Sequence, residues 1–167
     1  MTNKINEIVK TLDLLPHPEG GFYKETYRSS GIINPADLPD TITEERNYST
    51  CIYFLLTSEN FSAFHKINQD EIWHHYKGGR LTLHMISPEG VYSFVHIGKF
   101  ISDGEVPQFV VPAGYYFAAE IPEKDSYALC GCTVSPGFDF RDFSMPTRDN
   151  MLKLYPEHQD IIARLSR

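Results

Sequence analysis

The sequence predicts an all-β fold of the sandwich, jelly-roll or barrel type, with short helices confined to its two ends. Strand-like runs begin at residue 22 and, from residue 48 onward, follow one another at short, regular spacing. Turns that contain glycine or proline separate several of these runs. Aromatic residues make up 13% of the chain, and such side chains suit the pleated, half-buried surface of a sheet. The expected strands are 22–28, 48–57, 71–76, 80–86, 91–97, 107–112, 115–120 and 127–134.

The two ends of the chain have helical patterns instead. Apolar residues at helical spacing predict a helix over 3–14, and Pro16 and Pro18 then end it because proline lacks an amide donor. Residues 30–46, which contain two prolines and several acids, predict an exposed, mobile loop. Near the C-terminus, apolar residues on both sides of Pro156 predict helical pieces that close the domain.

The length of 167 residues fits one domain. We expect a single domain over 1–167 in three parts. Residues 1–46 supply a helix, a strand and a loop, residues 47–145 supply the barrel, and residues 146–167 supply a helical tail. A formal net charge of −7, without any Lys/Arg cluster longer than a pair, argues against a nucleic-acid partner, because phosphate binding requires a basic surface.

Cysteine usage and hydropathy predict a cytoplasmic protein. The odd count of three cysteines argues against a disulfide framework and favours a reducing compartment. The first twenty residues contain no unbroken apolar segment, and no run of eighteen apolar residues occurs anywhere, so we expect neither a leader peptide nor a membrane partner.

A group of polar residues in the middle of the chain predicts the functional site. His65, Glu71 and Gly78 have the separations of the first cupin motif, and Pro112-Ala113-Gly114 resembles the centre of the second motif. Segments 17–23 and 134–140 are similar to the flanking signatures of the Cupin_5 family, also called DUF985, and 50–56 and 70–74 are similar to its core strands. This resemblance implies a double-stranded β-helix (a cupin jelly-roll barrel) that is usually dimeric. It does not imply a known reaction.

The departures from the metal-binding cupin pattern predict a site without a metal cofactor. Ile67 stands where that pattern has its second histidine, and Phe117 stands where it has the histidine of the second motif. Two ligands bind most divalent metals weakly. If a metal is bound, its ligands are expected to be His65 and Glu71 together with His75, which strand alternation places on the same face as Glu71.

Without a metal, His65 and Glu71 have the chemistry of a proton-transfer pair. We expect Glu71 to raise the pKa of His65 and fix its tautomer, so that His65 acts as the base beside a substrate carbonyl. The hypothesis is a metal-independent epimerase or isomerase of a carbohydrate or sugar-nucleotide-like ligand, similar in kind to the metal-free sugar-nucleotide epimerases among cupins. The ligand is expected to contact Trp73, His75, Tyr115, Phe117, Glu19 and Tyr23.

Two other function classes remain open on the sequence. The first is a non-catalytic cupin that binds a small ligand and retains the pair without using it. The second is a metal-dependent oxidoreductase or dioxygenase with an incomplete ligand set. The apolar run at 48–56 and the family resemblance also predict a homodimer. No role is expected for His17, His96 or His158, and His74 and His84 are expected to be structural.

Overall fold

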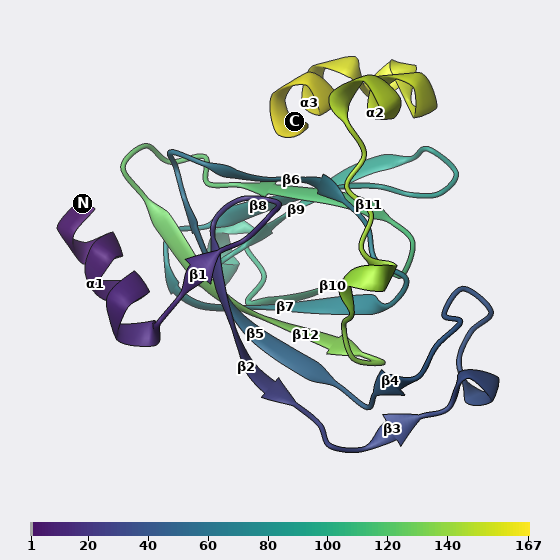
Figure 1. Ribbon diagram of the computed structural model, residues 1–167. Coiled ribbons are helices and arrows are strands. Elements are labelled where there is room, and N and C mark those ends of the chain that lie inside the picture. The colour runs from purple at the N-terminus through teal and green to yellow at the C-terminus, as the bar shows by residue number, and fades with distance from the viewer. Residues whose placement is uncertain (1) are drawn as a thin grey trace.

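The computed structural model describes residues 2–167, and two facing antiparallel sheets dominate it (Figure 1). The larger sheet contains, in spatial order, β1 (Leu15–Pro16), β2 (Phe22–Arg28), β5 (Thr50–Thr57), β12 (Tyr127–Ser135), β7 (Asp70–Gly78) and β10 (Gln108–Val111). The smaller sheet contains β6 (Phe61–His65), β11 (Tyr116–Glu120), β8 (Leu81–Ile86) and β9 (Tyr92–Ile97). The predicted all-β jelly-roll class with short terminal helices is confirmed.

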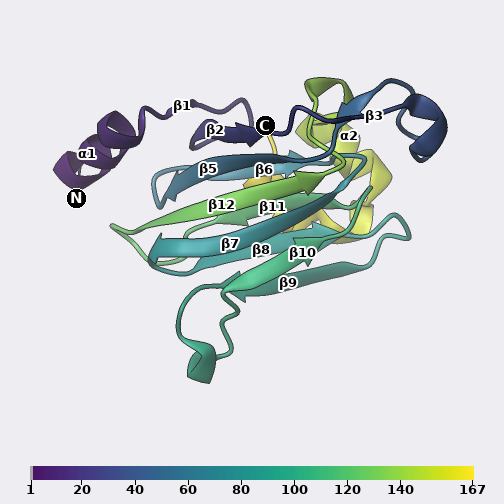
Figure 2. The ribbon, with the colours of Figure 1, turned by 90° about the horizontal axis from the view of Figure 1, so that it is seen from below.

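The main core fills the space between the two sheets. In Figure 2 the larger sheet faces the viewer and the strands of the smaller sheet lie behind it. Strand β12 pairs with β5 on one side and β7 on the other, and its side chains alternate in direction because successive residues of a strand face opposite ways. Its inward residues Cys130 and Cys132 pack with Phe54 and Trp73 against Phe117 of the smaller sheet. Strand β5 packs on both faces, because Phe54 and Leu56 point into this core and Leu55 points to the outer face, so its sequence is nearly continuously apolar.

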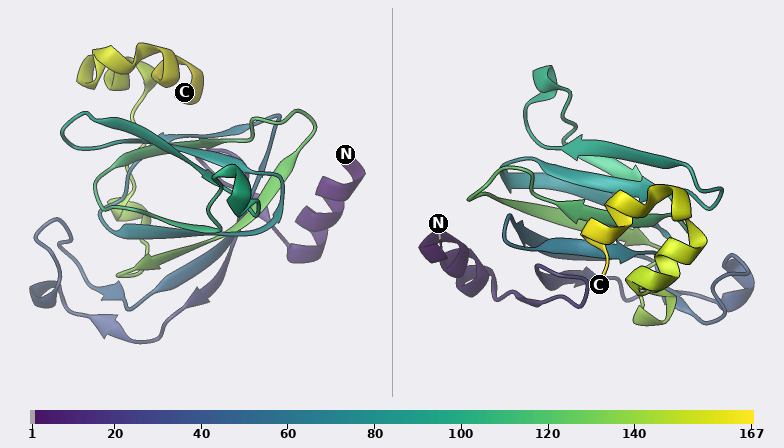
Figure 3. Two further views of the ribbon diagram at one scale, coloured as in Figure 1. Left: turned by 180° about the vertical axis from the view of Figure 1, so that it is seen from behind. Right: turned by 90° about the horizontal axis from the view of Figure 1, so that it is seen from above.

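Helices cover the outside of both sheets. Helix α1 (Thr2–Leu12) packs Ile5 and Val9 over the outer face of the larger sheet, against Leu55. Helices α2 (Arg148–Leu154) and α3 (Gln159–Leu165), with the short 3-10 turn η4 (Pro156–His158) between them, cover the smaller sheet (Figure 3, right). Both predicted helical regions are therefore present. Within residues 2–167, no helix is long and apolar enough to span a membrane.

The segment at 30–46 is more ordered than a plain exposed loop. It begins in β3 (Ile32–Ile33), which pairs antiparallel with β4 (Arg46–Asn47), and contains the 3-10 turn η1 (Pro35–Asp37). Ile42 is only 2% exposed. Most of the segment is exposed, as predicted, but a two-residue ladder joins its ends and one apolar side chain is buried within it.

Candidate functional site

A cavity of about 290 Å³ lies over the inner face of the larger sheet. Strands β2, β5, β7 and β12 supply its floor, and β6 supplies His65. Residues 17–19 form one wall of the cavity. A second segment, residues 138–143, crosses above the cavity, and we call this segment the strap. The strap contains the 3-10 turn η3 (Phe140–Asp142) and contributes Phe138, Phe140 and Phe143 to the lining. The cavity therefore combines aromatic side chains with several titratable groups.

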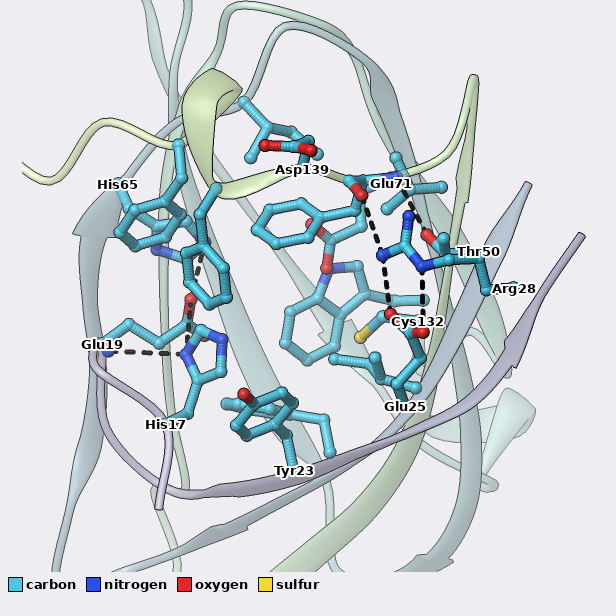
Figure 4. A pocket seen from close by; sticks show the side chains of 18 residues that line it. His17, Glu19, Tyr23, Glu25, Arg28, Thr50, His65, Glu71, Cys132 and Asp139 are labelled. Atoms are coloured by element: carbon cyan, nitrogen blue, oxygen red, sulfur yellow. Dashed lines mark hydrogen bonds and ion pairs between the residues drawn. The ribbon is translucent and has the colours of Figure 1, made fainter. Parts of the chain in front are cut away.

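The shortest ion-pair contact between buried side chains of the cavity joins His65 to Glu19. His65 Nε2 lies 3.0 Å from Glu19 Oε2, and His65 Nδ1 lies 2.7 Å from the carbonyl oxygen of Ala63. The other carboxyl oxygen of Glu19 accepts a hydrogen bond from Ser62 at 2.8 Å. His17 Nδ1 lies 3.4 Å from Glu19 Oε2. Glu19 thus lies between two imidazoles, as Figure 4 shows.

Two glycines bring Glu19 to this position. Gly20 and Gly21 have φ angles of 122° and 72°, a backbone region that disfavours every residue with a Cβ atom. A Cβ on Gly20 would lie 2.0 Å from the backbone carbonyl oxygen of Phe61. The turn lets the carbonyl of Glu19 accept the Ala63 amide at 2.9 Å, so the segment runs directly beside β6. Local glycine geometry therefore aligns Glu19 with a residue 46 positions away in the chain.

Hydrogen bonding and burial together favour particular protonation states of His65 and Glu19. The Ala63 carbonyl can only accept, so Nδ1 of His65 carries a proton and, in the neutral ring, Nε2 is an acceptor. Burial lowers the pKa of His65 although Glu71 and the Ala63 contact oppose it, and burial raises the pKa of Glu19. Both shifts favour the neutral forms, in which the carboxylic acid O–H of Glu19 donates a hydrogen bond to His65 Nε2.

Two expectations about His65 are corrected by this geometry. Glu19, and not Glu71, contacts the ring, and the tautomer is fixed by the Ala63 carbonyl. The pKa of His65 is lowered and not raised, because burial outweighs the nearby carboxyl. His17, for which no role was expected, belongs to the group, and burial lowers its pKa as well.

Glu71 is the one carboxyl group among the cavity-lining residues for which the described part of the chain shows no ion pair. Its side chain comes from β7 and the residue is 8% exposed. Burial raises the pKa of Glu71 to about 7, while His65 and the Cys132 thiol partly offset that rise and Glu19 adds to it. A carboxyl that titrates near neutrality can both accept and return a proton under ordinary conditions.

The raised pKa of Glu71 predicts a pH-dependent stability. Below pH 4.5 the carboxyl is protonated in both the folded and unfolded states, and between 4.5 and about 7 only the unfolded state ionises freely. The free energy of unfolding should therefore fall as pH rises through this window, by about 3 kcal/mol at 1.36 kcal/mol per pH unit. The measurement is urea unfolding of wild type and Glu71→Gln at matched pH values. Subtracting the free energy of unfolding of Glu71→Gln from that of wild type at each pH isolates the contribution of Glu71. The histidines have lowered pKa values, so their contribution to stability changes with pH in the opposite direction, and it cancels in this difference. A difference that is constant from pH 4.5 to 7.5 would contradict this assignment.

The structure gathers some of the residues predicted to contact a ligand and separates others. Glu19, Tyr23 and Trp73 line the cavity with His65 and Glu71. The remaining three do not line it. His75 lies farther along β7, and its Nε2 atom is 3.0 Å from the carbonyl oxygen of Gly79. Phe117 is in the core, with its ring centroid 4.1 Å from that of His65. Tyr115 packs against the same core. Strand alternation predicted His75, the position in the second cupin motif predicted Phe117, and the flat aromatic side chain predicted Tyr115. None of these signals gives the position of a side chain along the sheet.

Comparisons with known proteins agree with this architecture. The Cupin_5 model, described as cupin superfamily (DUF985), matches residues 6–146. The chain belongs to the Cupin_5 family. It is 38% identical to protein SO0799 of Shewanella oneidensis, whose crystal structure matches with a TM-score of 0.87 and coverage of 97% of this chain and 96% of that one. A hypothetical protein from Leishmania major matches at 35% identity, with a TM-score of 0.88 and coverage of 96% and 97%.

Two further comparisons with this Cupin_5 protein differ in what they show. The uncharacterized protein YML079W of Saccharomyces cerevisiae is 33% identical over 160 residues, which is 90% of this chain and 79% of that protein. Oxalate decarboxylase of Bacillus subtilis matches at only 13% identity, with a TM-score of 0.54 and coverage of 90% of this chain and 36% of that chain. The second likeness shows the shared cupin fold alone.

The cavity of this Cupin_5 protein does not fit the metal that many cupins hold. A divalent metal on a cupin wall needs three or four nitrogen or oxygen ligands. Ile67 and Phe117 cannot ligate, and His75 lies outside the cavity. Residues 2–167 bring together no group of three or more His, Cys, Asp or Glu side chains with a suitable arrangement.

Proposed function

We propose that this protein is a metal-independent isomerase or epimerase that moves a proton beside the carbonyl group of a carbohydrate-like ligand. The observation that carries the proposal is Glu71, a buried carboxyl with a pKa of about 7 that faces an aromatic cavity. Across that cavity, the acid of Glu19 lies between His65 and His17. A base of matched pKa and a nearby proton donor are the two groups that such a reaction requires.

The roles of the two groups follow from which atoms are free. Both nitrogens of His65 are occupied, by Ala63 and by Glu19, so the ring is not a free base. The Glu71 carboxylate removes a proton from the carbon next to the carbonyl, and the electrons of that C–H bond form a C=C double bond. The carbonyl oxygen takes up the displaced electron pair and receives the acid proton of Glu19, which leaves its hydrogen bond with His65 Nε2. When Glu71 returns its proton to the former carbonyl carbon, the hydroxyl on the neighbouring carbon gives its proton back to Glu19, and the product is the isomer. When the intermediate turns over and Glu71 protonates the original carbon on its other face, the enol hydroxyl gives its proton back to Glu19, and the product is the epimer.

The aromatic lining suits the proposed ligand. Trp73, Tyr23 and the phenylalanines of the strap present flat apolar surfaces to the cavity, and the apolar C–H face of a sugar ring packs well on such surfaces. The same enclosure excludes water from Glu71, which is the physical cause of its raised pKa and keeps an enediol intermediate from competing reactions.

Hydrogen exchange in deuterated water tests the proposal. The protein is incubated in D₂O with aldoses and ketoses of different stereochemistry, and loss of the C–H signal beside the carbonyl is followed by NMR. We expect stereospecific exchange, with formation of the isomer or epimer, for at least one sugar. Protein treated with a chelator should retain full activity. Saturable binding without exchange would replace the proposal with a non-catalytic binding protein, and loss of activity with the chelator would replace it with a metal enzyme.

A further inference from the structure

His17 is held at the base of the turn that brings Glu19 into the cavity. The backbone N–H of His17 donates to the carbonyl oxygen of Gly21 at 3.1 Å, and its own carbonyl oxygen accepts the Gly20 amide at 3.1 Å. Pro18 follows directly, and a residue that precedes proline is restricted to extended conformations. The backbone therefore fixes where the side chain begins, and Figure 4 shows that the imidazole points into the cavity.

Aromatic side chains fix the orientation of this imidazole. The ring centroid of Tyr23 lies 4.5 Å from it in an edge-to-face contact, and that of Phe54 lies 6.0 Å from it in another. From the strap, Phe140 stacks on the imidazole at 6.1 Å, and Phe143 meets it edge-to-face at 6.2 Å. A ring packed in this way is already oriented before a ligand enters, which is the condition for an effective hydrogen-bond donor in a reaction.

The two ring nitrogens of His17 have different surroundings. The backbone N–H of Glu19 points at Nδ1 from 3.4 Å, so Nδ1 is an acceptor and the proton of the neutral ring is on Nε2. Burial lowers the pKa of His17, although Glu19 opposes that shift, and this favours the neutral ring. Nε2 has no hydrogen-bond partner among residues 2–167, and it is not one of the unpartnered atoms that are closed to solvent. The cavity therefore contains the free N–H of a neutral imidazole.

The other side-chain nitrogens of the cavity are not available in this way. His65 is bonded at both ring nitrogens, and the guanidinium of Arg28 bonds both carboxylate oxygens of Glu25 at 3.0 and 2.7 Å. The indole nitrogen of Trp73 is closed to solvent. Among the lining residues of the described chain, Nε2 of His17 is therefore the uncharged side-chain nitrogen donor that a ligand oxygen can reach.

We propose that His17 is a further catalytic residue, whose Nε2–H donates a hydrogen bond to the carbonyl oxygen of the substrate and stabilises the negative charge that develops there. The inference rests on the proposed function and adds the residue that polarises the carbonyl group. A carbonyl oxygen has two lone pairs, so one accepts from His17 while the other takes the proton of Glu19. The imidazole keeps its proton throughout, and only Glu71 and Glu19 transfer protons.

The tautomer of His17 provides a test that needs no substrate. Long-range ¹H–¹⁵N NMR of protein labelled with ¹⁵N-histidine distinguishes a proton on Nε2 from one on Nδ1, and loss of a signal in His17→Phe assigns it. At neutral pH we expect a neutral His17 with its proton on Nε2, and the opposite tautomer, with the proton on Nδ1, for His65. A proton on Nδ1 of His17, or a charged imidazolium, would overturn the inference.

Proton exchange in D₂O then measures the contribution of His17, with the sugar that the wild-type protein turns over. His17→Phe keeps a flat ring among the aromatic neighbours and removes the donor, so kcat should fall by roughly 10²- to 10³-fold, the effect of losing one donor to a developing oxyanion. KM should change far less, because the bond is stronger in the transition state than in the bound substrate. His17→Gln supplies an amide N–H in place of Nε2–H and should exchange at least about tenfold faster than His17→Phe.

The control for these variants is His74→Phe, on the outer face of β7, which should exchange at the wild-type rate. Exchange by His17→Phe within about threefold of wild type, or by His17→Gln no faster than by His17→Phe, would overturn the inference, since a donor to the oxyanion contributes far more than that. Those results would leave the isomerase proposal standing. Absence of exchange by the wild-type protein with every sugar would instead remove the proposed function, and the role of His17 with it.

Discussion

Replacing Glu71 by Gln is expected to reduce proton exchange into the substrate by roughly 10²- to 10⁴-fold, the range that general acid–base catalysis contributes. Glutamine has nearly the shape of glutamate but cannot accept a proton in this reaction. The side chain is buried in the cavity and no ion pair among the described residues depends on it, so the fold should survive the change. NMR exchange in D₂O measures the rate, and calorimetry measures whether ligand binding is retained.

The contrast between two variants shows whether this loss is chemical. Glu59→Gln removes the same charge from an exposed turn and should leave the rate unchanged. Wild-type activity should rise with pH through the pKa of Glu71, about 7, because the ionised carboxylate is the base. Exchange by Glu71→Gln within about threefold of wild type would show that another group is the base, since general-base loss costs far more than that.

The sequence predicted the fold class and one half of the site for identifiable reasons. Strands such as β5 and β12 have largely apolar sequences, and this pattern follows directly from burial on both faces of the larger sheet. The motif spacing around His65 and Glu71 indicated residues that the structure does place in one cavity. Both signals are local, so they are visible in a single sequence.

The other half of the site depends on contacts between distant segments. Strand β6 was not predicted, although it carries His65, because its five residues are mixed in polarity and lack a clear alternation. The contact of Glu19 with His65 spans 46 positions and depends on the direction in which the Gly20–Gly21 turn sends the chain. Arg28 pairs with Glu25 on the same strand, β2, which has a register shift between Glu25 and Tyr27 that the sequence does not show.

A buried ion pair between Asp142 of the strap and Arg46 of β4 was not predicted from the sequence. Asp142 accepts hydrogen bonds at 2.8 Å from both Nε and Nη2 of Arg46, and a third from Gln69 at 2.5 Å. Burial alone would raise the pKa of Asp142, but the hydrogen bonds from Arg46 and Gln69 lower it below its usual value. Arg46 also donates to the carbonyl oxygens of Glu44 and Glu45. The pair therefore joins β4 to the strap, directly beside Phe143 of the cavity wall.

Replacing Asp142 by Asn should lower the free energy of unfolding by about 3–5 kcal/mol, because it leaves the Arg46 charge buried without a partner. Urea unfolding measures the change. Asp139→Asn is the matched control on the same strap; it removes a half-exposed pair with Arg141 and should cost no more than about 1 kcal/mol. The double variant Arg46→Met with Asp142→Leu removes both charges and should recover most of the lost stability, since the penalty comes from the unpaired ion and not from the missing pair. Two results would contradict this prediction: a loss of less than about 1 kcal/mol in Asp142→Asn, or a double variant that is as unstable as the single one. Either result would show that other groups stabilise the buried charge of Arg46, and that the phenylalanines of the strap hold it in place.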